Sequence, residues 1–205
     1  NVDVISFSIG SELSNGYCDS NIVANKSNYA VDKGIYVVAA TGNDESITSI
    51  RAPSCASSVT RVSSSTKQDT IASFSNINNL IDLVSPGKDI STIDINGNNI
   101  VLDGTSFSVP MVSGSALLIL ENRTLNPKNL TYLLRSTSEI INYNNINYNR
   151  LNLFNALINN KTNEPYNYDA NQSLIEGGNF TILVDTQNPS INFTNPTFAN
   201  ATTSR

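Results

Sequence analysis

The sequence contains no histidine and no tryptophan, and only one methionine and two cysteines among its 205 residues. Without histidine, this chain alone cannot complete any reaction in which an imidazole carries a proton. Charged residues make up 14% of the chain, its net charge is −5, and no basic run occurs, so we expect no nucleic-acid partner. No apolar run is long enough to cross a membrane. The apolar fraction of 39% suffices for a buried core and argues against a disordered chain.

Residues 104–110, Gly-Thr-Ser-Phe-Ser-Val-Pro, form the most informative stretch of the sequence. Small residues form a turn that presents Ser106, and the apolar run 111–120 is long enough for a buried helix. At the N-terminus of a helix the backbone N–H groups point outward, and the helix dipole favours negative charge. Acyl transfer needs a nucleophile in such a place, beside an oxyanion. The alternative is that Ser106 only caps an ordinary core helix.

Two short apolar runs predict strands of a parallel sheet. Residues 35–40, Ile-Tyr-Val-Val-Ala-Ala, follow a helical stretch and Gly34, and residues 2–9 have a similar composition. Runs of this kind are typical of strands buried on both faces. The repeated order of helix, strand and loop favours a doubly wound α/β layer, whose site lies past the carboxyl ends of the strands. Gly10 and Asn43 occupy such positions.

Residues 1–160 resemble the catalytic domain of subtilisin-like serine proteases, with 104–110 as the nucleophile motif. Five further segments match in the family's order, namely 3–10, 30–43, 52–54, 72–76 and 83–87. The resemblance implies a three-layer αβα domain with a mostly parallel sheet, of which the N-terminal part is missing. It also implies a serine endopeptidase that acts on polypeptides, with no metal and no other cofactor.

The resemblance assigns roles to single residues. Ser106 would be the nucleophile, and the side-chain amide of Asn43 would hold the oxyanion together with the N–H of Ser106. The alternative for Asn43 is a simple turn asparagine. The remaining substrate-binding residues would be Ser8, Ile9, Gly10, Ala40, Thr41, Gly42 and Arg51. Arg51 would lie near the floor of the specificity pocket and favour an acidic side chain, unless it points to solvent.

The family's catalytic aspartate and histidine precede the serine in sequence order, so both would lie upstream of residue 1. We therefore expect the C-terminal part of a longer catalytic domain, which is inactive alone. The alternative is a non-catalytic surface or adhesion protein that reuses the fold. A lipase or esterase of the α/β-hydrolase class is disfavoured, because the chain has no Gly-x-Ser-x-Gly motif. Asp82 alone is poor evidence for a calcium site.

Cys18 and Cys55 flank the segment that ends at Asn43. Some secreted bacterial members of the family carry cysteines in similar places, so the resemblance implies a Cys18–Cys55 disulfide. An extracellular or cell-surface location follows from such a bond. The alternative is two free buried thiols. The resemblance also implies a cis peptide bond between Ala52 and Pro53.

The C-terminal third of the chain carries weaker signals. The asparagine-rich tract 142–149 is interpreted as a compositional bias rather than a functional feature. Residues 161–205 predict a linker and a short β-rich tail, because a polar stretch precedes two strand-like runs joined by a turn at 185–189. This tail is similar to the opening of an immunoglobulin-like domain.

Overall fold

The computed structural model describes residues 2–159, so the predicted linker and β-rich tail lie outside the described residues. A six-stranded sheet has the order β1-β3-β5-β6-β10-β9. Its strands are β1 (Val4–Phe7), β3 (Tyr36–Ala40), β5 (Thr60–Ser65), β6 (Leu83–Pro86), β10 (Ile146–Arg150) and β9 (Glu139–Tyr143). All neighbouring pairs are parallel except β9 and β10. The mostly parallel sheet confirms the predicted α/β fold class.

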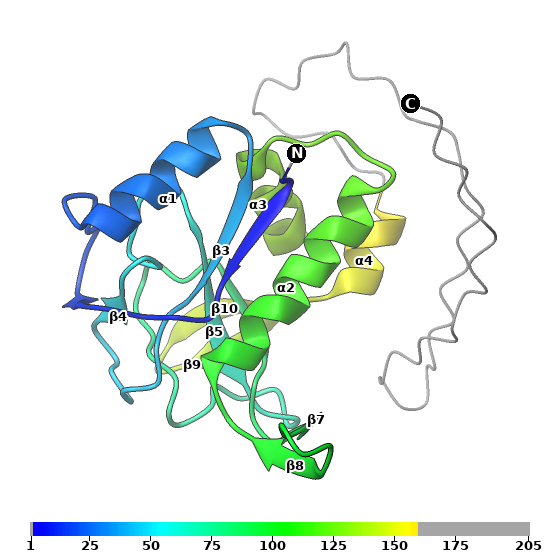
Figure 1. The fold of residues 1–205 in the computed structure, drawn as a ribbon. Helices are drawn as coiled ribbons and strands as arrows, with labels where there is room; N and C mark the ends of the chain where they lie inside the picture. The colour runs from blue at the N-terminus through cyan, green and yellow to red at the C-terminus, as the bar shows by residue number, and fades with distance from the viewer. Residues whose placement is uncertain (1, 160–205) are drawn as a thin grey trace. The chain divides into compact units, whose positions relative to one another are not determined.

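Helices cover both faces of this sheet (Figure 1). Helix α1 (Ile22–Asp32) packs on one face, and α2 (Thr105–Leu120), α3 (Pro127–Ser136) and α4 (Leu153–Ile158) pack on the other. Strand β3 is buried along its whole length, and successive side chains point to opposite faces. Val37 and Ala39 therefore meet α1, whereas Val38 and Ala40 join the core under α2. These contacts explain the uninterrupted apolar run of β3.

Two short antiparallel ribbons lie outside the main sheet. Strand β2 (Leu13–Ser14) pairs with β4 (Ile50–Arg51), and β7 (Ile90–Ile93) pairs with β8 (Asn99–Leu102). The chain leaves β8 and enters α2 directly, so the second ribbon adjoins the N-terminus of that helix (Figure 1). Both ribbons thus stand near the loops that follow the parallel strands.

The asparagine-rich tract 142–149 has a structural role that the compositional interpretation missed. It forms the turn of the β9–β10 hairpin, with Asn144 and Asn145 at φ values of 50° and 62°. Positive φ at both central residues is typical of the tight hairpin turns that asparagine tolerates. Ile141 and Tyr148 face each other across the hairpin, and both are buried. The tract therefore closes one edge of the sheet.

Candidate active site

The side chain of Asn43 caps the helix that carries Ser106. Residue Gly104, before the first turn of α2, has no side chain that could cap the helix. Instead, the Oδ1 atom of Asn43 accepts hydrogen bonds from the N–H of Thr105 (2.9 Å) and from its hydroxyl (2.8 Å). Because the backbone N–H can only donate, the accepting atom must be the amide oxygen. The loop after β3 is thereby fixed to the start of α2.

This capping arrangement fixes the direction of the other amide atom. The Nδ2 atom of Asn43 lies 3.4 Å from the position that a Cβ on Gly104 would take, and the Ser106 nitrogen lies 3.7 Å from the same position. Asn43 is exposed, and within residues 2–159 its Nδ2 atom has no acceptor. The N–H of Ser106 belongs to the first turn of α2, whose N–H groups have no acceptor within the helix. Two donors are therefore available beside Ser106.

Ser8 contacts Ser106, the predicted nucleophile, from the loop after β1. Its hydroxyl donates to the carbonyl oxygen of Ser106 (2.9 Å), and the Ser106 hydroxyl lies 3.4 Å from the carbonyl oxygen of Ser8. Within a helix, the Ser106 carbonyl would normally accept the N–H of residue 110. That residue is Pro110, which has no N–H, so Ser8 satisfies a carbonyl that the helix leaves free. Pro110 thus leaves the Ser106 carbonyl available to the Ser8 hydroxyl.

The start of α2 packs closely against the end of β6. A Cβ on Gly87 would lie 2.2 Å from the hydroxyl of Ser64 and 2.4 Å from that of Ser108, so only glycine fits there. The N–H of Gly104 donates to the Gly87 carbonyl (2.8 Å), and the Ser108 hydroxyl donates to the carbonyl of Ser85 (2.9 Å). The first turn of α2 is therefore held against the end of β6.

Asn76 organises the loop that follows β3, a role that sequence reasoning missed. It is fully buried, and its Oδ1 accepts from the N–H groups of Asp44 (2.8 Å) and Ser46 (3.1 Å). Its Nδ2 donates to the carbonyl of Thr41 (3.1 Å) and to the Asp44 carboxylate (2.8 Å). The only sequence signal was that Asn76 ends one of the five matching segments.

The predicted substrate-binding residues form two segments at the carboxyl ends of neighbouring strands. Ser8, Ile9 and Gly10 follow β1, while Ala40 ends β3 and Thr41 and Gly42 follow it. Ile9 is 60% exposed, whereas Ala40 and Thr41 are buried. The stem of Arg51 contacts both segments, because a Cβ on Gly10 would lie 2.7 Å from its Cδ and a Cβ on Gly42 3.1 Å from its Cγ. Arg51 therefore stands between the two segments.

The guanidinium of Arg51 is paired with a carboxylate of the chain itself, which the sequence did not predict. Its Nε donates to Oδ2 of Asp44 (2.7 Å), its Nη2 donates to Oδ1 of the same carboxylate (2.5 Å), and its Nη1 donates to the Ser11 carbonyl. The hydrogen bonds from Arg51, and then that from Asn76, hold the pKa of Asp44 below its usual value. The Asp44 carboxylate in turn raises the pKa of Arg51. The charge of Arg51 is thus neutralised within the chain.

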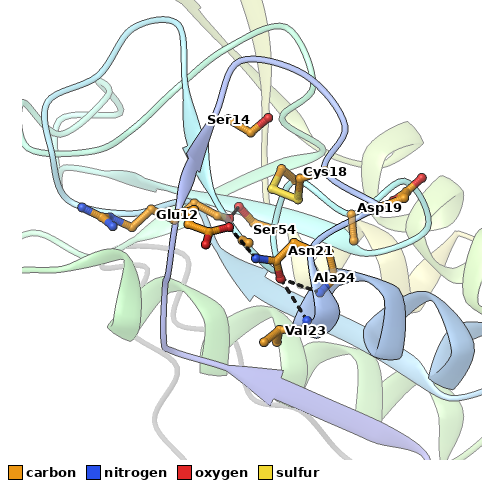
Figure 2. The surroundings of a disulfide bond; sticks show 12 residues. Glu12, Ser14, Cys18, Asp19, Asn21, Val23, Ala24 and Ser54 are labelled. Atoms are coloured by element: carbon orange, nitrogen blue, oxygen red, sulfur yellow. Dashed lines mark hydrogen bonds between the residues drawn. A yellow bond between two sulfur atoms is a disulfide. The ribbon is translucent and has the colours of Figure 1, made fainter.

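Cys18 and Cys55 form a disulfide with a Cα–Cα distance of 5.4 Å, as predicted. The N–H of Cys18 also donates to the carbonyl of Cys55 (3.0 Å). Figure 2 shows Asn21 nearby, where its side chain caps α1 and donates to Glu12 (2.8 Å). The predicted cis peptide bond between Ala52 and Pro53 is present as well. The cis bond and Cys55 both lie in the segment that directly follows Arg51.

Asp82 forms ion pairs rather than a cation site. Its carboxylate accepts from Arg61 (2.7 Å) and lies 3.4 Å from Arg135. Within the described part of the chain, no group of three His, Cys, Asp or Glu residues could hold a metal ion. No helix there is long and apolar enough to cross a membrane.

Ser106 lies at the start of a helix that is capped by Asn43 from the loop after β3, and this arrangement agrees with the comparison to known proteins. The profile of the subtilase family (Peptidase_S8) matches residues 1–173. The chain belongs to the subtilase family. Its relatives include proteins named as serine proteases.

Comparison with two relatives shows what share of a subtilase's length this chain covers. It is 32% identical over 157 residues to a thermophilic serine proteinase of Bacillus sp. (strain AK1), covering 76% of this chain and 37% of that protein. It is 38% identical over 96 residues to the subtilisin-like serine protease Pen ch 13 of Penicillium rubens, covering 46% of this chain and 24% of that protein. The chain thus spans less than half the length of these subtilases.

Solved structures confirm the fold. The prenylagaramide maturation protease PagA superimposes with a TM-score of 0.66 at 25% identity, covering 76% of this chain and 60% of that one. A cold adapted subtilisin-like serine proteinase gives a TM-score of 0.59 at 29% identity, covering 72% of this chain and 54% of the other. The chain therefore has the subtilisin-like three-layer α/β architecture.

Proposed function

We propose that this chain carries the nucleophile, the oxyanion donors and the substrate-binding segments of a subtilisin-type serine endopeptidase. The proposal is supported by the Asn43 side chain, whose Oδ1 caps α2 at Thr105 and whose Nδ2 lies 3.4 Å from the position that a Cβ on Gly104 would take, a position 3.7 Å from the Ser106 nitrogen. In the reaction, Ser106 Oγ attacks the carbonyl carbon of a peptide bond. Asn43 Nδ2 and the N–H of Ser106 then hold the oxyanion that forms.

The proton of Ser106 requires a base that residues 1–205 do not contain, because they include no histidine. We propose that a segment upstream of residue 1 supplies the catalytic histidine and aspartate. The sheet offers a place for it, because β1 is the outermost strand of the described sheet and pairs only with β3. A further parallel strand can add to that edge.

Without such a segment the chain is expected to be inactive. Loss of the histidine from a Ser-His-Asp enzyme costs about 10⁶ in kcat, a figure measured in subtilisin itself. Loss of one oxyanion donor costs about 10²–10³ in kcat, again a subtilisin value. We therefore expect the kcat of Asn43→Ala to lie below that of wild type but far above that of a protein without the catalytic histidine.

The disulfide supports an extracellular or cell-surface location for this enzyme, because such bonds persist in oxidising compartments. Its proposed substrates are polypeptides, in line with the protease names of its relatives. A polypeptide would add to the segment Ser8–Gly10 through backbone hydrogen bonds, in the manner of an extra strand.

The test compares residues 1–205 with the full-length protein, using a chromogenic peptide library as substrate. We expect cleavage only by the full-length protein, no cleavage by its Ser106→Ala variant, and wild-type cleavage by Ser136→Ala. Ser136 is a suitable control because it is exposed and bonds only locally, to the Leu133 carbonyl. Activity that survives Ser106→Ala contradicts the proposal. A full-length protein without activity supports the non-catalytic surface protein instead.

A further inference from the structure

Arg51 occupies the space between the two proposed substrate-binding segments. Each segment adjoins the start of α2, because Ser8 bonds to Ser106, and Asn43, which follows Gly42, bonds to Thr105. Gly10 lies two residues after Ser8, and the Arg51 stem fills the space that a side chain at Gly10 would need. Gly42 lies one residue before Asn43, and there Asn76, Asp44 and the Arg51 stem together fill that space. A substrate side chain that enters between the segments therefore meets the methylene groups of Arg51.

The position of Arg51 is fixed from several sides. Its backbone N–H donates to the Thr41 carbonyl (2.9 Å), which fixes β4 against the loop after β3. Its guanidinium grips both oxygens of Asp44, and the fully buried Asn76 holds that carboxylate from behind (2.8 Å). A paired, planar fork of this kind loses little entropy and resists displacement better than a single long side chain. The stem therefore acts as a rigid floor.

We propose that the Arg51–Asp44 pair makes this a peptidase for small, uncharged side chains at the residue that precedes the scissile bond. This inference rests on the proposed function and adds its substrate class. The stem of Arg51 excludes large side chains by bulk. Asp44 already satisfies the guanidinium, so an acidic side chain finds no free cation. A basic side chain meets the same positive group and gains no free carboxylate.

Three substitutions in the full-length protein separate bulk from charge. Arg51→Gly removes the stem and opens the space, so activity on Phe should rise relative to Ala. Arg51→Met keeps most of the bulk without the charge, so the preference for Ala over Phe should persist. Asp44→Asn keeps the stem but releases the positive charge, so activity on Glu should rise relative to Ala. As a control, Arg150→Met breaks an ion pair with Asp69 and should change neither ratio, because Arg150 belongs to β10, three strands away from β3 in the sheet.

The measurement is kcat/KM on peptides that differ only in Ala, Phe or Glu before the scissile bond, with thermal denaturation to confirm that each variant folds. We expect wild type to prefer Ala, and each relevant ratio to change by about tenfold or more, the scale on which pockets discriminate side-chain size. Cleavage with unchanged ratios in Arg51→Gly and Asp44→Asn overturns this inference alone. Absence of cleavage by wild type overturns the proposed function as well, so the two failures are distinguishable.

Discussion

Removal of the disulfide should cost a large share of the domain's stability. The bond joins residues 37 positions apart, and a cross-link removes loop-closure entropy from the unfolded chain. For a loop of that length, the chain-entropy relation gives about 4 kcal/mol at 25 °C. The Cα–Cα distance of 5.4 Å lies within the usual range for disulfides, so the folded state has no backbone misfit to set against this gain.

The variant for this test replaces both cysteines with alanine, since Cys55 is fully buried and a serine hydroxyl there would add a separate cost. The urea midpoint of this variant is compared with that of wild type under oxidising conditions and with that of wild type after reduction of the disulfide. At a urea m-value of about 2 kcal/mol/M, the midpoint should fall by about 2 M. Reduced wild type should show nearly the same shift. A shift below about 0.5 M, with thiol titration proving complete reduction, would refute the reasoning.

Three further predictions concern single contacts. Gly87→Ala should lower the free energy of unfolding by about 1–3 kcal/mol in urea denaturation, because its Cβ would overlap the Ser64 hydroxyl; an unchanged midpoint contradicts this. Ser8→Ala in the full-length enzyme should lower kcat up to about tenfold, because the Ser106 carbonyl loses its donor; unchanged kcat contradicts it. NMR titration should place the pKa of Asp44 below 3.8, and Arg51→Gln should raise it; an equal value in both proteins contradicts the pairing.

The sign of the Asp44 effect follows from the lowered pKa. A carboxylate whose folded pKa lies below its unfolded value adds stability above the unfolded value and loses it as the pH falls through the folded pKa. The contribution of the Arg51–Asp44 pair is therefore complete at neutral pH and is lost only in acid. Because both side chains are about one-third exposed, solvent screens the pair and keeps that contribution small.

The elements that sequence reasoning found are those with strong local signals. The apolar run of β3 and the long apolar stretch of α2 predict buried elements by composition alone, and Ser106 stands at the junction of turn and helix. The disulfide and the cis Ala52–Pro53 bond came from resemblance, because neither follows from local propensity. The hairpin at 142–149 was missed because its asparagine content hid a two-residue turn.

The environment of Arg51 could not be predicted from sequence, because it depends on contacts between distant segments. Its partner Asp44 is held by Asn76, which comes from a loop more than thirty residues further along the chain. The pairing of β4 with β2, only two residues long in each strand, brings Arg51 beside Gly10. Such short strands have no periodic pattern that a sequence can reveal. The resemblance predicted a place for Arg51 near the specificity pocket, and the structure identified Asp44 as its partner.

The most direct test of Ser106 as the nucleophile is mass-spectrometric mapping of a fluorophosphonate probe, which reacts with an activated serine hydroxyl. The full-length protein should carry one adduct, on the peptide that contains Ser106, and Asn43→Ala should slow its formation by about 10²-fold or more. Residues 1–205 alone should remain unlabelled, because they contain no histidine to activate the hydroxyl. An adduct on another serine, or peptide hydrolysis by a full-length protein whose Ser106 stays unmodified, would contradict the assignment.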